Sequence, residues 1–319
     1  MAGKKRSPKP DIILKNYWRN NERFADLFNA VLFEGEPVIQ PEELEDLDVE
    51  SSTILEHRNY AEGIAALRDN IKVRKRSTAH GIELVMLGNE SQEHINYAMP
   101  MRVMGYDYSA YKKQYDSNAA KYNNADGMEE DEYLSRMKRT DKFLPVITVT
   151  VYYGRKPWNG AMSLHGMLDI PEELRRYVND YRMLLVEARK NDLILHNANN
   201  ADLFNLLEIL LDGSRPAGEI RGRAIEYTKD RRVDRAVIVT AAGAVDNRID
   251  CNALEQRGDV DMYNVFEETR IEGRAEEIIE TGYEFGLSDD DILGRLQKKL
   301  TISLEMAQRY LSKFGKQNV

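Results

Sequence analysis

The feature that most constrains the fold of this chain is the stretch from residue 68 to residue 92, which has the pattern of a β-hairpin. Two arms flank the run STAHG at residues 77–81, whose small and polar residues, ending in glycine, are typical of a turn. Pairing the arms about the middle of this turn predicts three pairs of cross-strand neighbours: Val73 with Met86, Ile71 with Gly88, and Asp69 with Glu90. We therefore expect a sheet organised around this hairpin.

The predicted pairing brings the carboxylates of Asp69 and Glu90 together at one end of the hairpin. Because alternate side chains of a strand share a face, the amide of Gln92 reaches the same place. Two such carboxylates repel each other and are costly to desolvate unless a cation lies between them, and Mg²⁺ or Mn²⁺ prefers oxygen ligands. Acid pairs at strand ends are also commonly solvated, so the spacing alone leaves a metal site and a solvated pair open.

Composition places the chain among ordinary globular proteins, because 42% of its 319 residues are hydrophobic and 31% are charged. No apolar run approaches the roughly 20 residues of a membrane span, and the basic start MAGKKRSPKP lacks the apolar core of a signal peptide. The single Cys251 excludes an internal disulfide and a multi-cysteine metal site. We expect a cytoplasmic protein that is not inserted in a membrane.

The net charge of −9 argues against a general nucleic-acid coat. Basic residues nevertheless cluster at 4–9, at 72–76 and at 221–232, which fits either a local DNA-binding groove or ordinary solvated faces. Downstream of the hairpin, Arg102, Lys112 and Lys113 could meet phosphates if their face is open.

The remaining patterns predict an α/β fold with a mixed sheet flanked by helices. Apolar spacing indicates one amphipathic helix over 15–33, on which Glu22 and Asp26 lie one turn apart and either face the hairpin or face solvent. The β-branched run at 144–153 is the clearest strand, and 182–188 fits another. Residues 201–211 are strongly helical, and 232–244 fits a buried helix better than a strand.

Two segments lie outside these predicted helices and strands. Residues 116–141 are polar and are predicted to be a flexible insertion in a domain that spans 1–261. Residues 262–319 are predicted to form a C-terminal helical tail, in which Ser288 begins one short helix and a second covers 303–314. The pair fits a helix-turn-helix that reads DNA, or a helical hairpin that packs or self-associates into a homo-oligomer.

Three blocks of sequence resemble the recombination-promoting nuclease (Rpn) family, whose members are also described as transposases. The blocks are RDNIK, GNESQEHINYAMPMRVMGYD and FLPVITVTVYYGRKPWNGAMSLHGML, and the resemblance as a whole covers about residues 16–168. The charged C-terminal helices are similar to the tail of that family. The resemblance implies a PD-(D/E)XK nuclease-like fold, with Asp69 and Glu90 as the metal-binding acids. Gln92 then stands where the superfamily usually has lysine, and Asn89 where an apolar residue is expected.

The function implied by this resemblance is hydrolysis of phosphodiester bonds in double-stranded DNA by a Mg²⁺-dependent endonuclease. Asp69, Glu90 and the main-chain carbonyl of Ser91 would hold the metal, and Gln92 could orient the attacking water. Lys72 is a weak candidate for stabilising negative charge, because strand alternation turns it away from Asp69. His94 and His165 are expected to be structural or exposed. The alternative is a catalytically degenerate protein that binds DNA or a protein partner through a nuclease fold.

Overall fold

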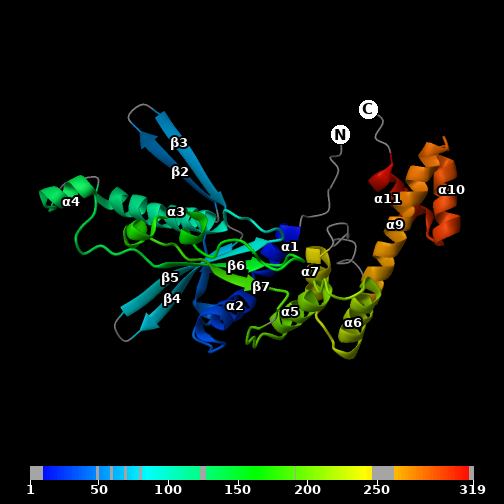
Figure 1. The fold of residues 1–319 in the computed structure, drawn as a ribbon, viewed down its shortest axis with the longest axis horizontal. Helices are drawn as coiled ribbons and strands as arrows, with labels where there is room; N and C mark the ends of the chain where they lie inside the picture. Colours follow the sequence, from blue (N-terminus) through cyan, green and yellow to red (C-terminus); the bar gives the residue numbers. More distant parts are fainter. Residues whose placement is uncertain are drawn as a thin grey trace.

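The computed structural model describes residues 10–47, 50–57, 60–67, 70–78, 81–122, 127–190, 192–245 and 262–315. These residues form a mixed α/β fold around a five-stranded sheet of order β1–β4–β5–β6–β7 (Figure 1). The strands are β1 (Leu44–Asp46), β4 (Asn70–Thr78), β5 (Gly81–Gln92), β6 (Val146–Tyr152) and β7 (Leu184–Glu187). The predicted α/β class with a mixed sheet is confirmed.

The sheet is antiparallel on one side of β5 and parallel on the other. β1 and β4 pair antiparallel, as do β4 and β5, whereas β6 runs parallel to β5 and β7 runs parallel to β6. Parallel neighbours need a crossover connection. Helix α3 (Met99–Ala119) lies in the connection from β5 to β6 and packs against β6.

The β4–β5 hairpin has the register that the sequence predicts. Val73 pairs with Met86 and Ile71 pairs with Gly88. Pairing continues to Thr78 and Gly81, so three of the five residues assigned to the turn, Ser77, Thr78 and Gly81, belong to the strands, and residues 79 and 80 lie outside the described residues. The register was therefore predicted correctly, whereas the strands extend further than predicted.

Strand β6 is covered on both faces, and its alternating side chains show which helices cover each face. Val149 and Val151 are buried in the main hydrophobic core with residues of α1, α2, α5 and α7. Thr148 points to the other side, where its hydroxyl donates to Asp107 on α3 over 2.6 Å. The sheet therefore lies between α3 and a layer that includes α1, α2, α5 and α7.

The predicted single helix over 15–33 is wrong, because the structure has two helices there: α1 (Pro10–Tyr17) and α2 (Asn21–Phe33). The break has a local cause. The side chain of Asn20 accepts a hydrogen bond from the main-chain N–H of Arg23 over 3.0 Å and so caps the start of α2. Trp18, between the two helices, is fully buried in the main hydrophobic core.

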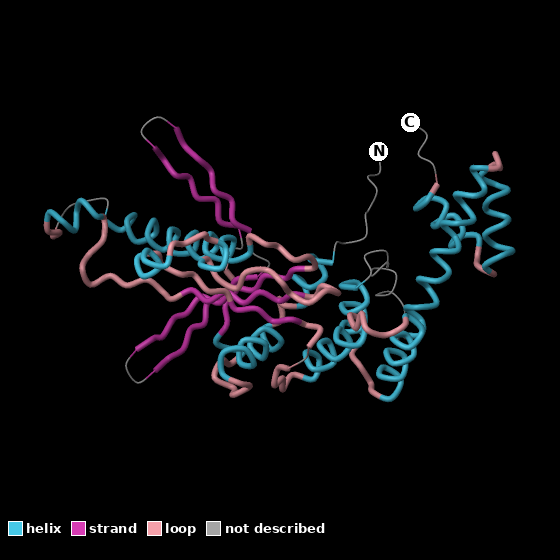
Figure 2. The backbone as a smooth tube through the Cα atoms, viewed as in Figure 1, coloured by secondary structure: helices cyan, strands magenta, loops and turns pink. Residues whose placement is uncertain are grey.

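A second hairpin, which the sequence pattern did not predict, precedes β4. Strands β2 (Glu50–His57) and β3 (Tyr60–Leu67) pair antiparallel with each other and form a two-stranded sheet of their own. Figure 2 shows this ribbon projecting away from the main sheet, and it contacts α3. The run YAEGIAAL in β3 is rich in alanine and glycine, which are poor strand formers, so composition gives little signal.

The layer opposite α3 includes α5 (Ala198–Leu210) and α7 (Arg235–Val245), and α6 (Ala217–Asp230) packs against α5. The helix predicted at 232–244 is confirmed from residue 235 onward. Among the helices that the structure describes, none has both the length and the apolar character needed to cross a bilayer. Short 3-10 helices are η1 (Pro41–Glu43), η3 (His165–Met167) and η4 (Glu172–Tyr177).

The predicted insertion at 116–141 contains helical structure. Its described part holds the end of α3, η2 (Ala120–Tyr122) and α4 (Glu130–Ser135). The carboxylate of Asp141 accepts hydrogen bonds from Asn118, Tyr122 and the main-chain N–H of Lys138 at 2.7, 3.0 and 2.8 Å. These bonds join the two ends of the segment, and its flexibility stays a prediction.

The C-terminal residues form three helices: α9 (Met262–Glu284), α10 (Asp289–Leu300) and α11 (Leu304–Phe314). Ser288 caps α10 as predicted, since its hydroxyl accepts from the N–H of Asp291. The second half of α9 packs with α10 and α11 in a small hydrophobic cluster, while Met262 and Val265 at its start belong to the main core. The helix-turn-helix reading of α10 and α11 stays a prediction.

Candidate active site at the carboxyl end of β5

The carboxyl ends of the parallel strands β5 and β6 lie side by side at one edge of the sheet. The register pairs Glu90 with Thr150 and Gln92 with Tyr152. Ligands of α/β sheets bind in crevices outside the carboxyl ends of parallel strands. This edge is therefore the candidate active site, and it contains the predicted residues 90–92.

Of the two predicted acids, Asp69 lies outside the described residues, and Glu90 is described through its main chain alone. The described pair nearest to both positions is Asn70 with Asn89. Every described pair of the hairpin agrees with the predicted register. The approach of the two carboxylates stays a prediction.

Gln92 is held from two sides at the end of β5. Its Oε1 accepts a hydrogen bond from Nη1 of Arg102 over 3.3 Å, and its Nε2 donates to the main-chain carbonyl of Ser91 over 3.1 Å. An arginine side chain can only donate hydrogen bonds, so the Gln92 amide turns its oxygen and not its nitrogen toward Arg102.

Helix α3 brings the positive charge of Arg102 to Gln92. The half-buried guanidinium also donates to the hydroxyl of Tyr106, one turn along, and lies 5.6 Å from the centre of that ring. Lys112, which the sequence grouped with Arg102, pairs with Asp116 at 2.5 Å. At a rise of about 1.5 Å per residue, Lys112 is about 15 Å further along the helix. Arg102 is therefore the cation of this group that belongs to the site.

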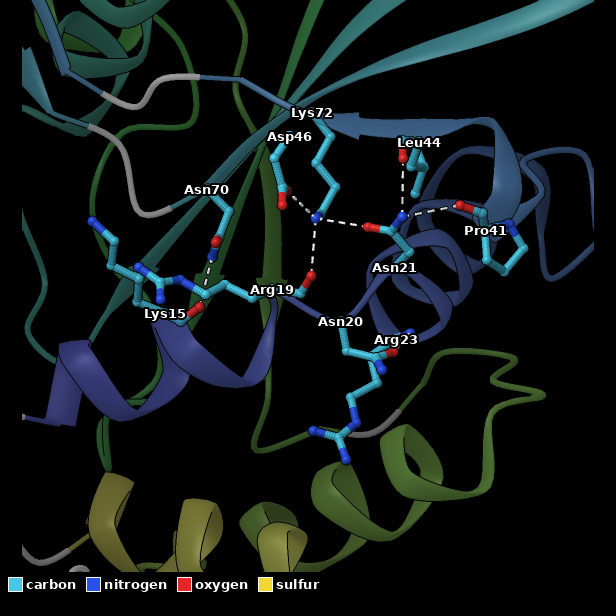
Figure 3. A network of polar contacts seen from close by, with 10 residues as sticks. All are labelled: Lys15, Arg19, Asn20, Asn21, Arg23, Pro41, Leu44, Asp46, Asn70 and Lys72. Carbon is cyan, nitrogen blue, oxygen red and sulfur yellow. Dashed lines mark hydrogen bonds and ion pairs between the residues drawn. The ribbon is translucent and has the colours of Figure 1, made fainter.

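Lys72 lies on the other face of the sheet, as strand alternation predicts. Its side chain is fully buried, and Nζ donates to the carbonyl of Arg19 at 2.9 Å and to Oδ1 of Asn21 at 2.8 Å (Figure 3). It also forms an ion pair with Asp46, whose side chain is 74% exposed. Lys72 therefore fastens the α1–α2 junction to β4 and is remote from the candidate site.

The two acids of α2 are also accounted for. Glu22 is exposed in the first turn of the helix. Asp26 is buried, and its carboxylate accepts from the main-chain N–H groups of His196 and Asn197 at 2.8 and 3.0 Å and from the amide of Asn200 at 2.8 Å. Asp26 thus holds the segment before α5 against α2.

Sequence patterns did not reveal a polar group between α3 and β6. Asp107 is buried and accepts from Thr148 and from the hydroxyl of Tyr181. One step along the same face, the hydroxyl of Thr150 is fully buried and has no hydrogen-bond partner in the described part of the chain. Since Thr150 pairs with Glu90, an unpartnered oxygen lies on the strand next to the predicted metal ligand.

A cavity of about 650 Å³ opens directly beyond the strand ends. We call it the strand-end pocket. Its lining begins at Glu93, one residue after Gln92, and includes His94, which is exposed. His165 is elsewhere: its Nε2 lies 2.7 Å from the carbonyl oxygen of Val178, in agreement with a structural role. The residues that line the pocket are Glu93, His94, Ile95, Tyr97, Tyr152, Tyr153, Gly154, Arg155, Lys156, Pro157, Asn159, Leu211, Ala244 and Val245.

Within the described ranges, no group of three or more histidine, cysteine, aspartate or glutamate side chains is arranged to hold a metal ion. The predicted ligands Asp69 and Glu90 fall outside that search, because their side chains are not described. Comparison of the chain with protein-family models, with curated proteins and with solved structures finds no match.

Proposed function

We propose that this chain is a metal-dependent endonuclease that hydrolyses phosphodiester bonds in double-stranded DNA, on the PD-(D/E)XK plan implied by its resemblance to the Rpn family. The observation that carries the proposal is the arrangement of β4, β5, α3 and β6. An antiparallel hairpin is followed by a crossover helix and a parallel strand, and residues 90–92 end β5 where α3 and β6 converge. This arrangement supports a single site built from hairpin, helix and strand-end loops.

The donor set around the site fits a hard divalent cation. Asp69, Glu90 and the carbonyl of Ser91 would hold Mg²⁺ or Mn²⁺ through oxygen atoms, which these ions prefer. The unpartnered hydroxyl of Thr150 supports a polar ligand at this position, because a buried hydroxyl without a partner is costly. When bound, such an ion polarises a phosphodiester and lowers the pKa of a bound water.

The protein's own residues then have distinct tasks. Gln92 cannot act as a base, but its amide, fixed between Arg102 and the Ser91 carbonyl, can orient a water molecule. Arg102 supplies the positive charge that lysine would bring at position 92, and its guanidinium suits a phosphate oxygen. The charge therefore comes from α3 instead of β5.

The test is cleavage of supercoiled plasmid by purified protein with Mg²⁺, with Mn²⁺ and with a chelator. We expect nicking only with metal, and loss of nicking in Asp69→Ala and Glu90→Ala. Glu22→Ala is a matched control, because Glu22 is exposed on α2 away from the site, and it should cut like the wild type. Circular dichroism establishes that each variant is folded.

The competing function is a non-catalytic protein that binds DNA or a protein partner. That reading predicts a shift of DNA without cutting, no heat of Mg²⁺ or Mn²⁺ binding in a calorimetric titration, and alanine variants that behave like the wild type. Any metal-dependent nicking that survives in both Asp69→Ala and Glu90→Ala would mean that the proposed acids are not the ligands.

A further inference from the structure

The strand-end pocket adjoins the end of β5, where the proposed site lies. Its lining starts at Glu93, directly after Gln92, and continues through the loop that follows β6. Its volume of about 650 Å³ lies within the usual range for sites that bind small molecules. The position and size suit one nucleotide.

The walls of the pocket are aromatic and apolar. Leu211, Ala244 and Val245, at the ends of α5 and α7, contribute apolar surface. Tyr97 is 65% exposed, and its hydroxyl has no hydrogen-bond partner among the residues whose placement is described. Tyr152 is fixed, since its hydroxyl donates to the carbonyl of Lys156 over 2.8 Å and its ring meets Trp158 edge-on at 5.2 Å. An exposed phenol ring beside an apolar surface offers a stacking platform for a base.

The rim of the pocket is cationic. Arg155 and Lys156 are exposed, and neither side chain forms an ion pair with a described residue, while Glu93 is the acid of the lining. Gly154 sets the shape of this loop: a Cβ atom there would lie 2.2 Å from the hydroxyl of Tyr152 and 2.5 Å from the carbonyl of Glu93. The loop is thus pressed against the segment after β5, and its two cations stand beside the aromatic wall.

We propose that the strand-end pocket binds one unpaired nucleotide of the DNA strand, with the base stacked on Tyr97 and its phosphate near Arg155 and Lys156. This inference rests on the proposed nuclease function and extends it, because it assigns the enzyme a preference for DNA with an unpaired base next to the scissile bond. A free nucleoside monophosphate offers the same base and phosphate, so the experiment must distinguish a nucleotide within a DNA strand from a free nucleotide.

The experiment measures binding by fluorescence anisotropy in a chelator, so that no DNA is cut. The probes are a labelled single-stranded oligonucleotide, the same strand with abasic sites, and the corresponding blunt duplex, and thymidine 5′-monophosphate is the competitor. We expect Tyr97→Ala and Lys156→Ala each to weaken single-strand binding about tenfold. Tyr133→Ala and Lys142→Ala, exposed residues outside the pocket, are matched controls that should bind like the wild type.

The outcomes decide the inference. Weaker binding of the abasic strand and of the duplex by the wild type, together with loss in the two pocket variants, supports it. Equal binding of the abasic and intact strands overturns it, as does competition by thymidine 5′-monophosphate at the same concentration as the oligonucleotide, which would identify a free nucleotide as the ligand.

The failure of this inference and that of the nuclease proposal can be told apart. Asp69→Ala should bind the single strand like the wild type while it no longer cuts. If Asp69→Ala abolishes cutting but Tyr97→Ala changes neither binding nor cutting, the nuclease stands and the pocket assignment is overturned. If nothing cuts but Tyr97→Ala weakens binding tenfold, the pocket stands and the nuclease is overturned.

Discussion

Replacing the buried Lys72 by methionine should destabilise the fold without touching the chemistry. Methionine keeps the length of the side chain but removes Nζ, which donates to the Arg19 carbonyl and to Oδ1 of Asn21. Asn21 also donates to the carbonyls of Pro41 and Leu44 at 3.1 and 2.9 Å, so one amide joins α2, η1 and β1 (Figure 3). Lys72→Met therefore weakens the contact between this amide and β4.

The magnitude follows from the acceptors that lose their donor. An acceptor left unsatisfied in the interior costs about 1–3 kcal/mol. Arg19 is exposed, so water can replace the lost bond at its carbonyl, and the cost there lies at the lower end. We expect a loss of about 2–3 kcal/mol in the free energy of unfolding. Asp46 is 74% exposed, and Asp46→Asn should cost less than about 1 kcal/mol.

The assay is urea unfolding followed by tryptophan fluorescence, because Trp18 is fully buried next to Arg19 and reports on this junction. The same two variants are then assayed for plasmid cleavage in buffer without urea, at a temperature at which both are folded. Equal destabilisation by Lys72→Met and Asp46→Asn would show that the ion pair, and not the helix-junction acceptors, provides the stability. Loss of cleavage by a folded Lys72→Met variant would contradict the placement of Lys72 outside the candidate site.

Three other predictions follow from particular contacts. Arg102→Ala should lower kcat by about one hundredfold, as loss of one charge-stabilising donor does. Arg102→Lys should be partly active, and Lys112→Ala, about 15 Å further along α3, should cut like the wild type. Equal rates in all three variants would mean that Arg102 does not belong to the site. Burial and the 2.6 Å hydrogen bond to Asp202 raise the pKa of Tyr227 to about 12 from its ordinary value of 10.0. Its folded pKa is raised, so the stability it contributes is complete below pH 10 and is lost as the pH rises toward 12; Tyr227→Phe should flatten the stability profile measured by urea unfolding in that window, and an unchanged slope would contradict the assignment. Phe285 and Leu304 of the tail are exposed, and we expect them to form contacts in a homo-oligomer. Light scattering should therefore give a lower mass for the double variant Phe285→Ser, Leu304→Ser than for the wild type. A monomeric wild type would exclude this association.

The parts of the fold that follow local patterns were predictable from the sequence. The turn at 77–81 and period-two alternation predicted the pairs Val73–Met86 and Ile71–Gly88. The β-branched run 144–153 predicted β6, and the hydroxyl of Ser288 predicted the start of α10. In each case a few adjacent residues carry the signal, because turns, caps and alternation act over one or two turns of chain.

Other parts depend on competition between local signals. Apolar residues at helical spacing on both sides of residues 19–23 predict one helix over 15–33, but the polar run 19–23 contains Asn20, whose cap starts a new helix there. The β2–β3 ribbon has the opposite problem, since its alanines and glycine favour no strand and its pairing partner supplies the structure. Propensity alone could not decide either case.

The strand-end pocket and the position of Arg102 depend on residues far apart in sequence. The pocket is lined by Tyr97, by the loop after Tyr152, and by Leu211 and Val245, so no local sequence pattern predicts it. The sequence named Arg102 as a phosphate-binding candidate but gave no reason to prefer it to Lys112 or Lys113. The preference comes from the direction of α3, which starts next to the end of β5 and carries the later lysines away from it.

The segment 93–98 between β5 and α3 links the two proposals physically. It follows Gln92, supplies Glu93, His94 and Tyr97 to the pocket, and leads into the helix that carries Arg102. A base that stacks on Tyr97 would add contacts to this segment, and these contacts would stabilise the first turn of α3 and the hydrogen bond from Arg102 to Gln92. Binding of an unpaired nucleotide should therefore raise the cleavage rate as well as the affinity, so Tyr97→Ala is expected to lower kcat together with raising KM. A change in KM alone would mean that the pocket holds DNA without organising the site.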